Sequence, residues 1–170
     1  SNIPEQWLGS YSSISRNWDL LMHNSPFYLM FVAAGNDGDN NFGNSDPLDG
    51  DTLFDKLSGI SVAKNNVVVA NGQDANINPD GTFNAVIRNS SSSEGPTDDY
   101  RIKPDIMGNG TSVYSAFHFP SWEDATNVPN QDPTPATNDD DYRSIDGTSM
   151  ATPNVSGSSL LLQEHYNNLN

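Results

Sequence analysis

The sequence predicts an α/β fold built on a mostly parallel sheet, and three features of the chain support this. Residues 27–34 and 66–70 are apolar runs of strand length without polar alternation. Such runs are typical of strands covered on both faces, as in parallel sheets with helices packed on each side. Helical patterns precede the first run and close the chain, so helix and strand alternate. We therefore expect a partial three-layer αβα arrangement.

The first helix is expected to begin near Ser13 or Ser15, either of which can cap it, and to end at Ser25-Pro26. Its apolar residues recur at helical spacing. They define a single face, which consists of Ile14, Trp18, Leu21 and Met22.

The remaining elements follow in order. Residues 51–59 are predicted to form a short helical piece, and Asn78-Pro79-Asp80-Gly81 a hairpin turn. Residues 101–107 indicate a short strand interrupted by Pro104. A tight turn at Gly147 then leads into the last helix, with Pro153 expected in its first turn, where a missing N–H costs nothing.

Residues 111–146 are mostly polar and too long for an ordinary connection, so they are interpreted as a solvated insertion. Only two buried strands are clear, which is fewer than a complete doubly wound domain needs. The sheet is therefore expected to be incomplete at its N-terminal side.

Composition excludes several classes of function. The chain of 170 residues has 7 Lys and Arg against 22 Asp and Glu, which gives a net charge of −15. Such a charge argues against nucleic acid and anionic membranes as partners, because phosphate groups are bound by clustered Lys and Arg. No apolar run reaches the roughly 18–20 residues that span a bilayer. The acidity and the Asn- and Ser-rich loops favour a secreted or cell-surface bacterial protein.

The absence of cysteine removes disulfide scaffolds, thiolate metal sites and cysteine nucleophiles. A different nucleophile stands out. Ser149 lies at a turn entering a helix, where the positive end of the helix dipole can stabilise an oxyanion. The amide of Asn36, at the tip of a buried strand, can supply a second hydrogen bond to the same oxyanion.

Three segments carry these residues in order along the chain. They are Phe31-Val32-Ala33-Ala34-Gly35-Asn36, Lys103-Pro104-Asp105-Ile106 and Gly147-Thr148-Ser149-Met150-Ala151-Thr152-Pro153-Asn154-Val155-Ser156-Gly157. Together they resemble the subtilisin-like serine proteases. The last segment matches that family's nucleophile signature at every specified position, and the resemblance extends from about Ser10 to the end of the chain.

The resemblance implies a serine endopeptidase that forms an acyl-enzyme and requires no cofactor. It implies Ser149 as nucleophile and Asn36 in the oxyanion hole. It also places Ala33, Ala34, Gly35 and Thr148 at the substrate. Lys103-Pro104-Asp105 is interpreted as structural. Residues 1–170 would form the C-terminal part of the peptidase domain, with the insertion near residues 111–146.

The family's catalytic Asp and His segments precede the oxyanion Asn, and neither is found in the 35 residues before Asn36. His165 lies sixteen residues beyond Ser149, about 24 Å along a helix, and His23 is expected at the far end of the sheet. His118, in the insertion, is a weak alternative. We therefore expect the chain alone to be inactive, with the missing N-terminal part as its partner and self-association through the open sheet edge.

Calcium binding has weaker support. Asp37-Gly38-Asp39-Asn40-Asn41 and Asp139-Asp140-Asp141 are rich in oxygen ligands, but the first lacks the glycine and glutamate of an EF-hand. Solvated acidic loops are the favoured interpretation, with no metal site assigned. A second hypothesis is a non-catalytic relative with calcium-dependent binding or adhesion. The intact Ser and Asn motifs argue against it.

Overall fold

The computed structural model of the chain describes residues 7–40, 54–116 and 142–169. Two α-helices, one 3-10 helix and seven strands occur in these residues. In chain order they are α1 (Ser13–His23), β1 (Phe31–Ala33), η3 (Gly59–Val62), β2 (Val67–Gly72), β3 (Asn76–Ile77), β4 (Phe83–Ala85), β5 (Ile106–Asn109), β6 (Val113–Ala116), β7 (Tyr142–Ile145) and α2 (Thr148–Leu169).

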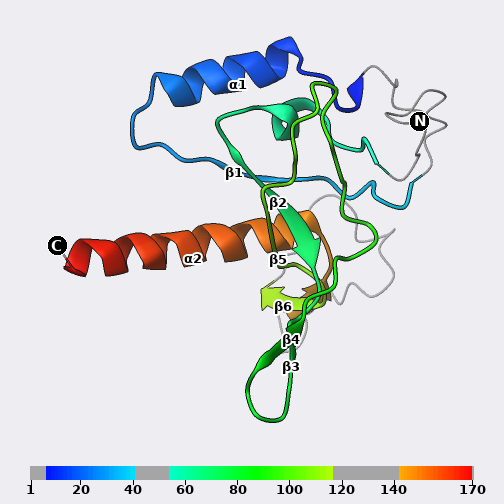
Figure 1. Cartoon of the computed structure of the whole chain (residues 1–170), viewed down its shortest axis with the longest axis vertical. Coiled ribbons are helices and arrows are strands. Elements are labelled where there is room, and N and C mark those ends of the chain that lie inside the picture. The colour runs from blue at the N-terminus through cyan, green and yellow to red at the C-terminus, as the bar shows by residue number, and fades with distance from the viewer. Residues whose placement is uncertain (1–6, 41–53, 117–141, 170) are drawn as a thin grey trace, which may run out of the picture.

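The central sheet has the order β1-β2-β5, and both pairings are parallel. Helix α2 packs on one side of this sheet, and α1 lies on the other side beyond η3 (Figure 1). The α/β fold class is thereby confirmed, and the layers have the order expected of a partial αβα fold. Short flanking strands form separate pairs, β3 with β4 and β6 with β7.

Strand β2 supplies the centre of the core because its apolar residues point alternately to both faces of the sheet. Val68 packs with Ala34, Leu57 and Val62 on the η3 side. Val69 packs instead with Ala151 and Val155 of α2. All members of both clusters are at most 9% exposed. A strand buried on both faces explains why residues 66–70 show no polar alternation.

Helix α1 forms where the sequence predicts it, but its cap and its buried face differ from the prediction. The cap is Ser12, which forms a capping box with Ser15. The buried residues are Ser15, Asp19 and Met22, whereas Ile14 and Leu21 of the predicted face are 56% and 46% exposed. Helix propensity and capping therefore determine where along the chain the helix forms, while its polar contacts determine which of its sides is buried.

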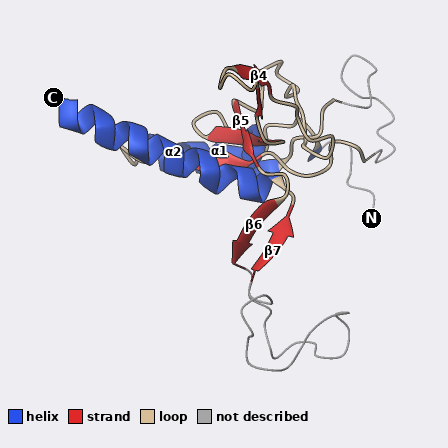
Figure 2. Cartoon of the chain, turned by 90° about the horizontal axis from the view of Figure 1, so that it is seen from below, coloured by secondary structure: helices blue, strands red, loops and turns tan. Residues whose placement is uncertain are grey.

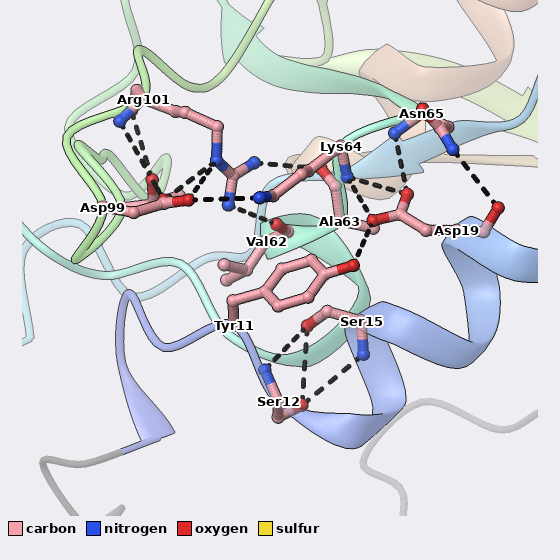
Figure 3. Close-up of polar contacts among 11 residues, drawn as sticks. Tyr11, Ser12, Ser15, Asp19, Val62, Ala63, Lys64, Asn65, Asp99 and Arg101 are labelled. Atoms are coloured by element: carbon pink, nitrogen blue, oxygen red, sulfur yellow. Dashed lines mark hydrogen bonds and ion pairs between the residues drawn. The ribbon is translucent and has the colours of Figure 1, made fainter.

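Those contacts form a polar network between α1 and the segment that follows η3 (Figure 3). The Asp19 carboxylate accepts hydrogen bonds from the backbone N–H groups of Lys64 and Asn65 and from the Tyr11 hydroxyl. The Ser15 hydroxyl donates to the Gly59 carbonyl over 2.7 Å. A buried carboxylate with this many donors is well satisfied, so the helix docks through polar groups.

Two other predictions were wrong in their bounds. The expected strand at residues 27–34 is reduced to β1, and Phe27 and Leu29 before it are exposed. The expected helical piece at residues 51–59 is not present in its described part. The 3-10 helix η3 begins only at Gly59, the last residue of the predicted piece, and residues 51–53 lie outside the described residues. The predicted hairpin turn near Asp80 is present between β3 and β4.

The described residues of the polar segment 111–146 include two strands. Its first and last parts pair as β6 and β7, an antiparallel ribbon that projects away from the sheet (Figure 2). Tyr114 and Tyr142 stack across this ribbon with ring centroids 5.7 Å apart. The two ends of the expected insertion are therefore paired strands where the sequence predicted irregular structure. Residues 117–141 lie outside the described residues.

Within the described parts of the chain, neither helix is both long and apolar enough to cross a membrane.

Candidate active site

The site is assembled where the strands of the parallel sheet end and helix α2 begins. Asn36 follows β1, Gly72 ends β2 and Gly110 follows β5. Because parallel strands share one carboxyl edge, these residues gather at the same edge of the sheet. The turn that starts α2 is fixed there, since the Gly147 N–H donates to the Gly110 carbonyl over 2.8 Å.

Glycine is required at position 147 for conformational reasons. Its φ is +157°, within the range that side-chain-bearing residues rarely adopt. Its carbonyl accepts hydrogen bonds from Met150 and Ala151 over 3.0 and 3.2 Å, which closes the first turn of α2. A Cβ here would lie 3.5 Å from Asn36 Nδ2. The turn therefore brings the Asn36 carboxamide against the start of the helix.

Thr148 determines how the Asn36 side chain is oriented. The Asn36 Oδ1 atom accepts two hydrogen bonds from Thr148, from its backbone N–H at 2.9 Å and from its hydroxyl at 3.1 Å. The Thr148 hydroxyl oxygen also accepts from the Gly35 N–H at 3.3 Å. With Oδ1 occupied by donors, the carboxamide presents Nδ2 as a donor on its other side. Thr148 itself is fully buried, so its side chain holds Asn36 and does not face a substrate.

Ser149 is exposed and lies in the first turn of α2. The N–H groups of a first helical turn have no partner within the helix, and the helix dipole makes this end positive. Asn36 lies against this helix terminus, because its Oδ1 atom accepts from the Thr148 N–H at 2.9 Å. Such an arrangement of donors can stabilise a tetrahedral oxyanion.

Pro153 lies deeper in α2 than the sequence predicts. The helix begins at Thr148, so Pro153 is its sixth residue and lies beyond the first turn. The missing N–H of Pro153 would otherwise bond to the carbonyl of Ser149 in the regular i to i−4 pattern. The neighbouring Thr152 hydroxyl donates to the Thr148 carbonyl at 2.7 Å, which adds a hydrogen bond at this end of the helix.

The predicted substrate residues divide into two groups. Ala33 and Gly35 are partly exposed beside Asn36. Ala34 is 3% exposed and belongs to the core cluster on the η3 side, and its N–H donates to the Val69 carbonyl. Its side chain is therefore unavailable to line a pocket. Among these residues, Ala33 and Gly35 are the ones with partly exposed surface.

The Lys103-Pro104-Asp105 segment lies near the amino end of the sheet strands. Lys103 Nζ donates to Asp105 Oδ2 at 2.6 Å and to the Asn66 carbonyl at 3.0 Å. The same Asp105 oxygen accepts from the Val68 N–H at 2.7 Å. These bonds tie β5 to β2 at the opposite edge from Asn36, which agrees with the structural interpretation of this segment.

Neither described histidine accompanies Ser149. His23 is the last residue of α1, and His165 is exposed near the far end of α2. His118 lies outside the described residues. Within residues 7–40, 54–116 and 142–169, no group of three or more His, Asp or Glu residues is arranged to hold a metal. Asp139, Asp140, Asp141 and Asn41 are outside this part of the chain.

The structure also places at the site a residue that the sequence did not single out. Asn71 is fully buried near the carboxyl end of β2 and accepts a hydrogen bond from the Thr111 hydroxyl at 3.1 Å. The sequence did contain a signal for this residue, because the polar Asn71 directly follows the apolar run Val67-Val68-Val69-Ala70 within the same strand. It could be mistaken for a turn residue beside Gly72.

No curated protein matches the chain. The family description "Peptidase_S8: Subtilase family" matches residues 6–170, which is nearly the whole sequence. This match includes the strand that leads to Asn36 and the helix that carries Ser149. The chain therefore belongs to the subtilase family of peptidases.

Proposed function

We propose that the chain supplies the nucleophile and the oxyanion hole of a secreted serine endopeptidase. The observation that carries this proposal is the Asn36 carboxamide. Its oxygen is engaged by Thr148, and its Nδ2 is left to donate beside the exposed Ser149. Asn36 and Thr148, the neighbour of Ser149, are 112 residues apart in the chain, so their contact depends on the fold.

In the proposed reaction the Ser149 hydroxyl attacks the carbonyl carbon of a peptide bond. The carbonyl oxygen becomes an oxyanion and is stabilised by the Ser149 N–H and Asn36 Nδ2. Collapse of the tetrahedral intermediate expels the amine and leaves an acyl-enzyme, which water then hydrolyses. Ala33 and Gly35 contact the substrate residue before the scissile bond. This chemistry requires no cofactor.

A base must remove the Ser149 proton, and a carboxylate must orient that base. We propose that both come from polypeptide outside residues 1–170, because His23 and His165 lie on other parts of the fold and His118 lies in the polar insertion after Asn36, whereas the family's His segment precedes that Asn. The chain by itself is then inactive. Its partner is the N-terminal part of the peptidase domain, whether on the same polypeptide or on another.

The edge of β1 is the place where this partner binds. In the parallel ladder, Met30 and Ala34 bond to β2, so the N–H and C=O groups of Phe31 and Ala33 point to the opposite side. An added parallel strand can pair there. Its carboxyl end would then lie at the same edge of the sheet as Asn36, which is where a base for Ser149 is needed.

The test is labelling with a fluorophosphonate, which reacts with activated serines. The chain together with the upstream polypeptide is expected to be labelled, and Ser149→Ala is expected to abolish labelling. Residues 1–170 alone are expected to remain unlabelled. Labelling that persists in Ser149→Ala would show that another residue is the nucleophile, and labelling of residues 1–170 alone would refute the proposed external base.

A further inference from the structure

Asn71 is a polar side chain in an otherwise apolar part of the sheet. It is fully buried, and its register partner on β5 is Gly108. Its Oδ1 atom accepts from the Thr111 hydroxyl, but its Nδ2 atom has no partner among the described residues. A buried amide donor without a partner costs folding free energy, and an alanine or valine would avoid that cost.

The hydrogen bonds around Asn71 hold the segment that follows β5. The Thr111 hydroxyl oxygen accepts from Asn89 Nδ2 at 2.9 Å while it donates to Asn71 Oδ1. The Asn89 backbone N–H donates in turn to the Asn71 carbonyl at 2.9 Å. Asn71 is thus connected to Thr111 both directly and through Asn89. The side chains of Asn71 and Asn89 together fix Thr111 against the end of β2.

The residue before Thr111 connects this network to the nucleophile. The Gly110 N–H donates to the Gly72 carbonyl at 3.1 Å, and the Gly110 carbonyl accepts from the Gly147 N–H at 2.8 Å. A Cβ on Gly110 would lie 2.5 Å from the Gly147 carbonyl oxygen and 2.7 Å from Asn71 Oδ1. Gly110 therefore packs between Asn71 and the turn that precedes Ser149, and a side chain at this position would clash with both.

We infer that Asn71 is a positioning residue for Ser149. It acts through Thr111 and Gly110 to set the location of Gly147, and hence of the first turn of α2 relative to Asn36. Because the nucleophile and the oxyanion donor sit on different elements, their separation depends on such fixed contacts. Small displacements of reacting groups lower a rate strongly while leaving ground-state binding nearly unchanged. The inference rests on the proposed function.

A purely structural role for Asn71 predicts a different result. In that case, removing its side chain would change the stability and leave the rate of acylation per folded molecule unaltered. If Asn71 positions Ser149, the rate falls even though the protein remains folded. Stability and acylation must therefore be measured on the same variants.

The experiment uses the complete protease, with the polypeptide that supplies the base. Asn71→Ala removes the acceptor, and Thr111→Val removes the hydroxyl with nearly the same shape. Thr111→Ser keeps the hydroxyl and serves as the conservative rescue. The control is Asn66→Ala, which removes another buried asparagine, one that donates to the Ile60 carbonyl before β2 begins. The readouts are kcat, KM, the rate of fluorophosphonate labelling and Tm.

Asn71→Ala and Thr111→Val are each expected to lower kcat and the labelling rate by about 10- to 100-fold with little change in KM. The double variant is expected to lose no more than either single variant, because the two residues act through one hydrogen bond. Thr111→Ser should retain the wild-type rate. Asn66→Ala should lower Tm and leave the labelling rate per folded molecule unchanged.

The two proposals fail in distinguishable ways. If the wild type is not labelled, the proposed peptidase function is wrong. If the wild type is labelled and Asn71→Ala and Thr111→Val react at the wild-type rate, the positioning role is wrong. Hydrogen exchange at the Gly147 amide gives a readout independent of activity. It should be faster in Thr111→Val than in Thr111→Ser, and equal exchange in both would overturn the inference.

Discussion

At the scale of single residues, the site depends on the hydrogen bonds that orient Asn36. Thr148 donates twice to Asn36 Oδ1, and Thr148 is itself fixed by burial and by the Gly35 N–H. A carboxamide that can rotate freely would present its oxygen to an oxyanion as often as its nitrogen. In the proposed site, the contacts with Thr148 fix the orientation of the carboxamide before a substrate binds, and such preorganised donors stabilise an oxyanion.

The first prediction is that Asn36→Leu in the complete protease lowers kcat by about 10²- to 10³-fold. Leucine has a similar shape but no donor, so the oxyanion loses one hydrogen bond while KM stays nearly the same. Steady-state kinetics on a peptide substrate measure the change. Asn40→Ala, a substitution at another exposed asparagine four residues away, should leave kcat unaltered. An Asn36→Leu enzyme with wild-type kcat would exclude Asn36 from the oxyanion hole.

The second prediction concerns the pH dependence of stability. The Thr97 hydroxyl first, and then Arg101 and Lys64, hold the pKa of Asp99 below its usual value. A lowered carboxyl pKa stabilises the fold above the unfolded pKa of about 3.9, and this contribution disappears as pH falls through the folded pKa. Asp99→Asn should therefore destabilise the protein at pH 7, by at most about 1 kcal/mol because the ion pair is exposed.

The pKa of Asp98 is shifted in the opposite direction from that of Asp99, so the substitution of Asp98 should change the stability with the opposite sign. Burial first, and the charge of Asp99 second, raise the pKa of Asp98. A raised carboxyl pKa means that ionisation of Asp98 opposes folding. The protonated carboxyl favours the folded state at low pH, and this contribution to stability is lost as pH rises through the folded pKa. Asp98→Asn should thus stabilise the protein at pH 7. Urea unfolding at pH 7 and pH 3 tests both variants, and effects of the same sign at pH 7 would contradict this account.

At the scale of elements, helix α2 is docked by close backbone contact with β5. A Cβ at Gly108 would lie 2.6 Å from Val155 Cγ2 and 2.9 Å from the Ala151 carbonyl oxygen. The helix can approach the strand only because no side chain stands between them. This approach places Gly147 and the first turn of α2 at the edge of the sheet, so a packing contact determines where Ser149, the proposed nucleophile, lies.

The third prediction is that Gly108→Ala destabilises the protein by about 1–3 kcal/mol, the usual cost of overpacking. The added methyl group must displace α2 from β5. The matched control is Gly157→Ala, because Gly157 lies on α2 and a Cβ added there would meet no atom within 4 Å. That substitution should be neutral or stabilise the helix by up to about 1 kcal/mol. Thermal unfolding of both variants measures the difference, and equal Tm values would argue against close docking.

At the scale of the whole molecule, much apolar surface is exposed. Leu160, Leu161 and Leu162 are 66–69% exposed on the outer part of α2, which extends beyond the sheet (Figure 1). Phe27 is also fully exposed just before β1. Exposed large apolar side chains, together with an open strand edge, are typical of a protein that binds another chain. The apolar residues on the exposed side of α1 fit the same pattern of an uncovered binding surface.

The fourth prediction is that residues 1–170 on their own self-associate. The net charge of −15 opposes association through repulsion, so raising the salt concentration should strengthen it. Analytical ultracentrifugation at low and high salt measures the change. Leu161→Lys combined with Leu162→Lys should weaken association. A monodisperse monomer with a cooperative transition at high temperature would contradict the prediction.

The sequence by itself determined the α/β class and the positions of β2, of the β3–β4 turn and of both long helices. These depend on local patterns, namely apolar periodicity, turn residues and the spacing of a family signature. The same patterns led to the proposal of Ser149 and Asn36 as site residues. Local patterns do not determine which face of an amphipathic helix is buried, and so the burial of Ser15 and Asp19 in place of Ile14 and Leu21 was not foreseen.

Only the tertiary structure decided how the site is held together. The contacts between Asn36 and Thr148, and between Asn71, Thr111 and the Gly110–Gly147 turn, join residues up to 112 positions apart. Hydrogen bonds of this kind exist only after the strands are in register and α2 has packed on them. A sequence pattern reports the residues that are close along the chain, whereas the geometry of an oxyanion site depends on residues that the sheet brings together.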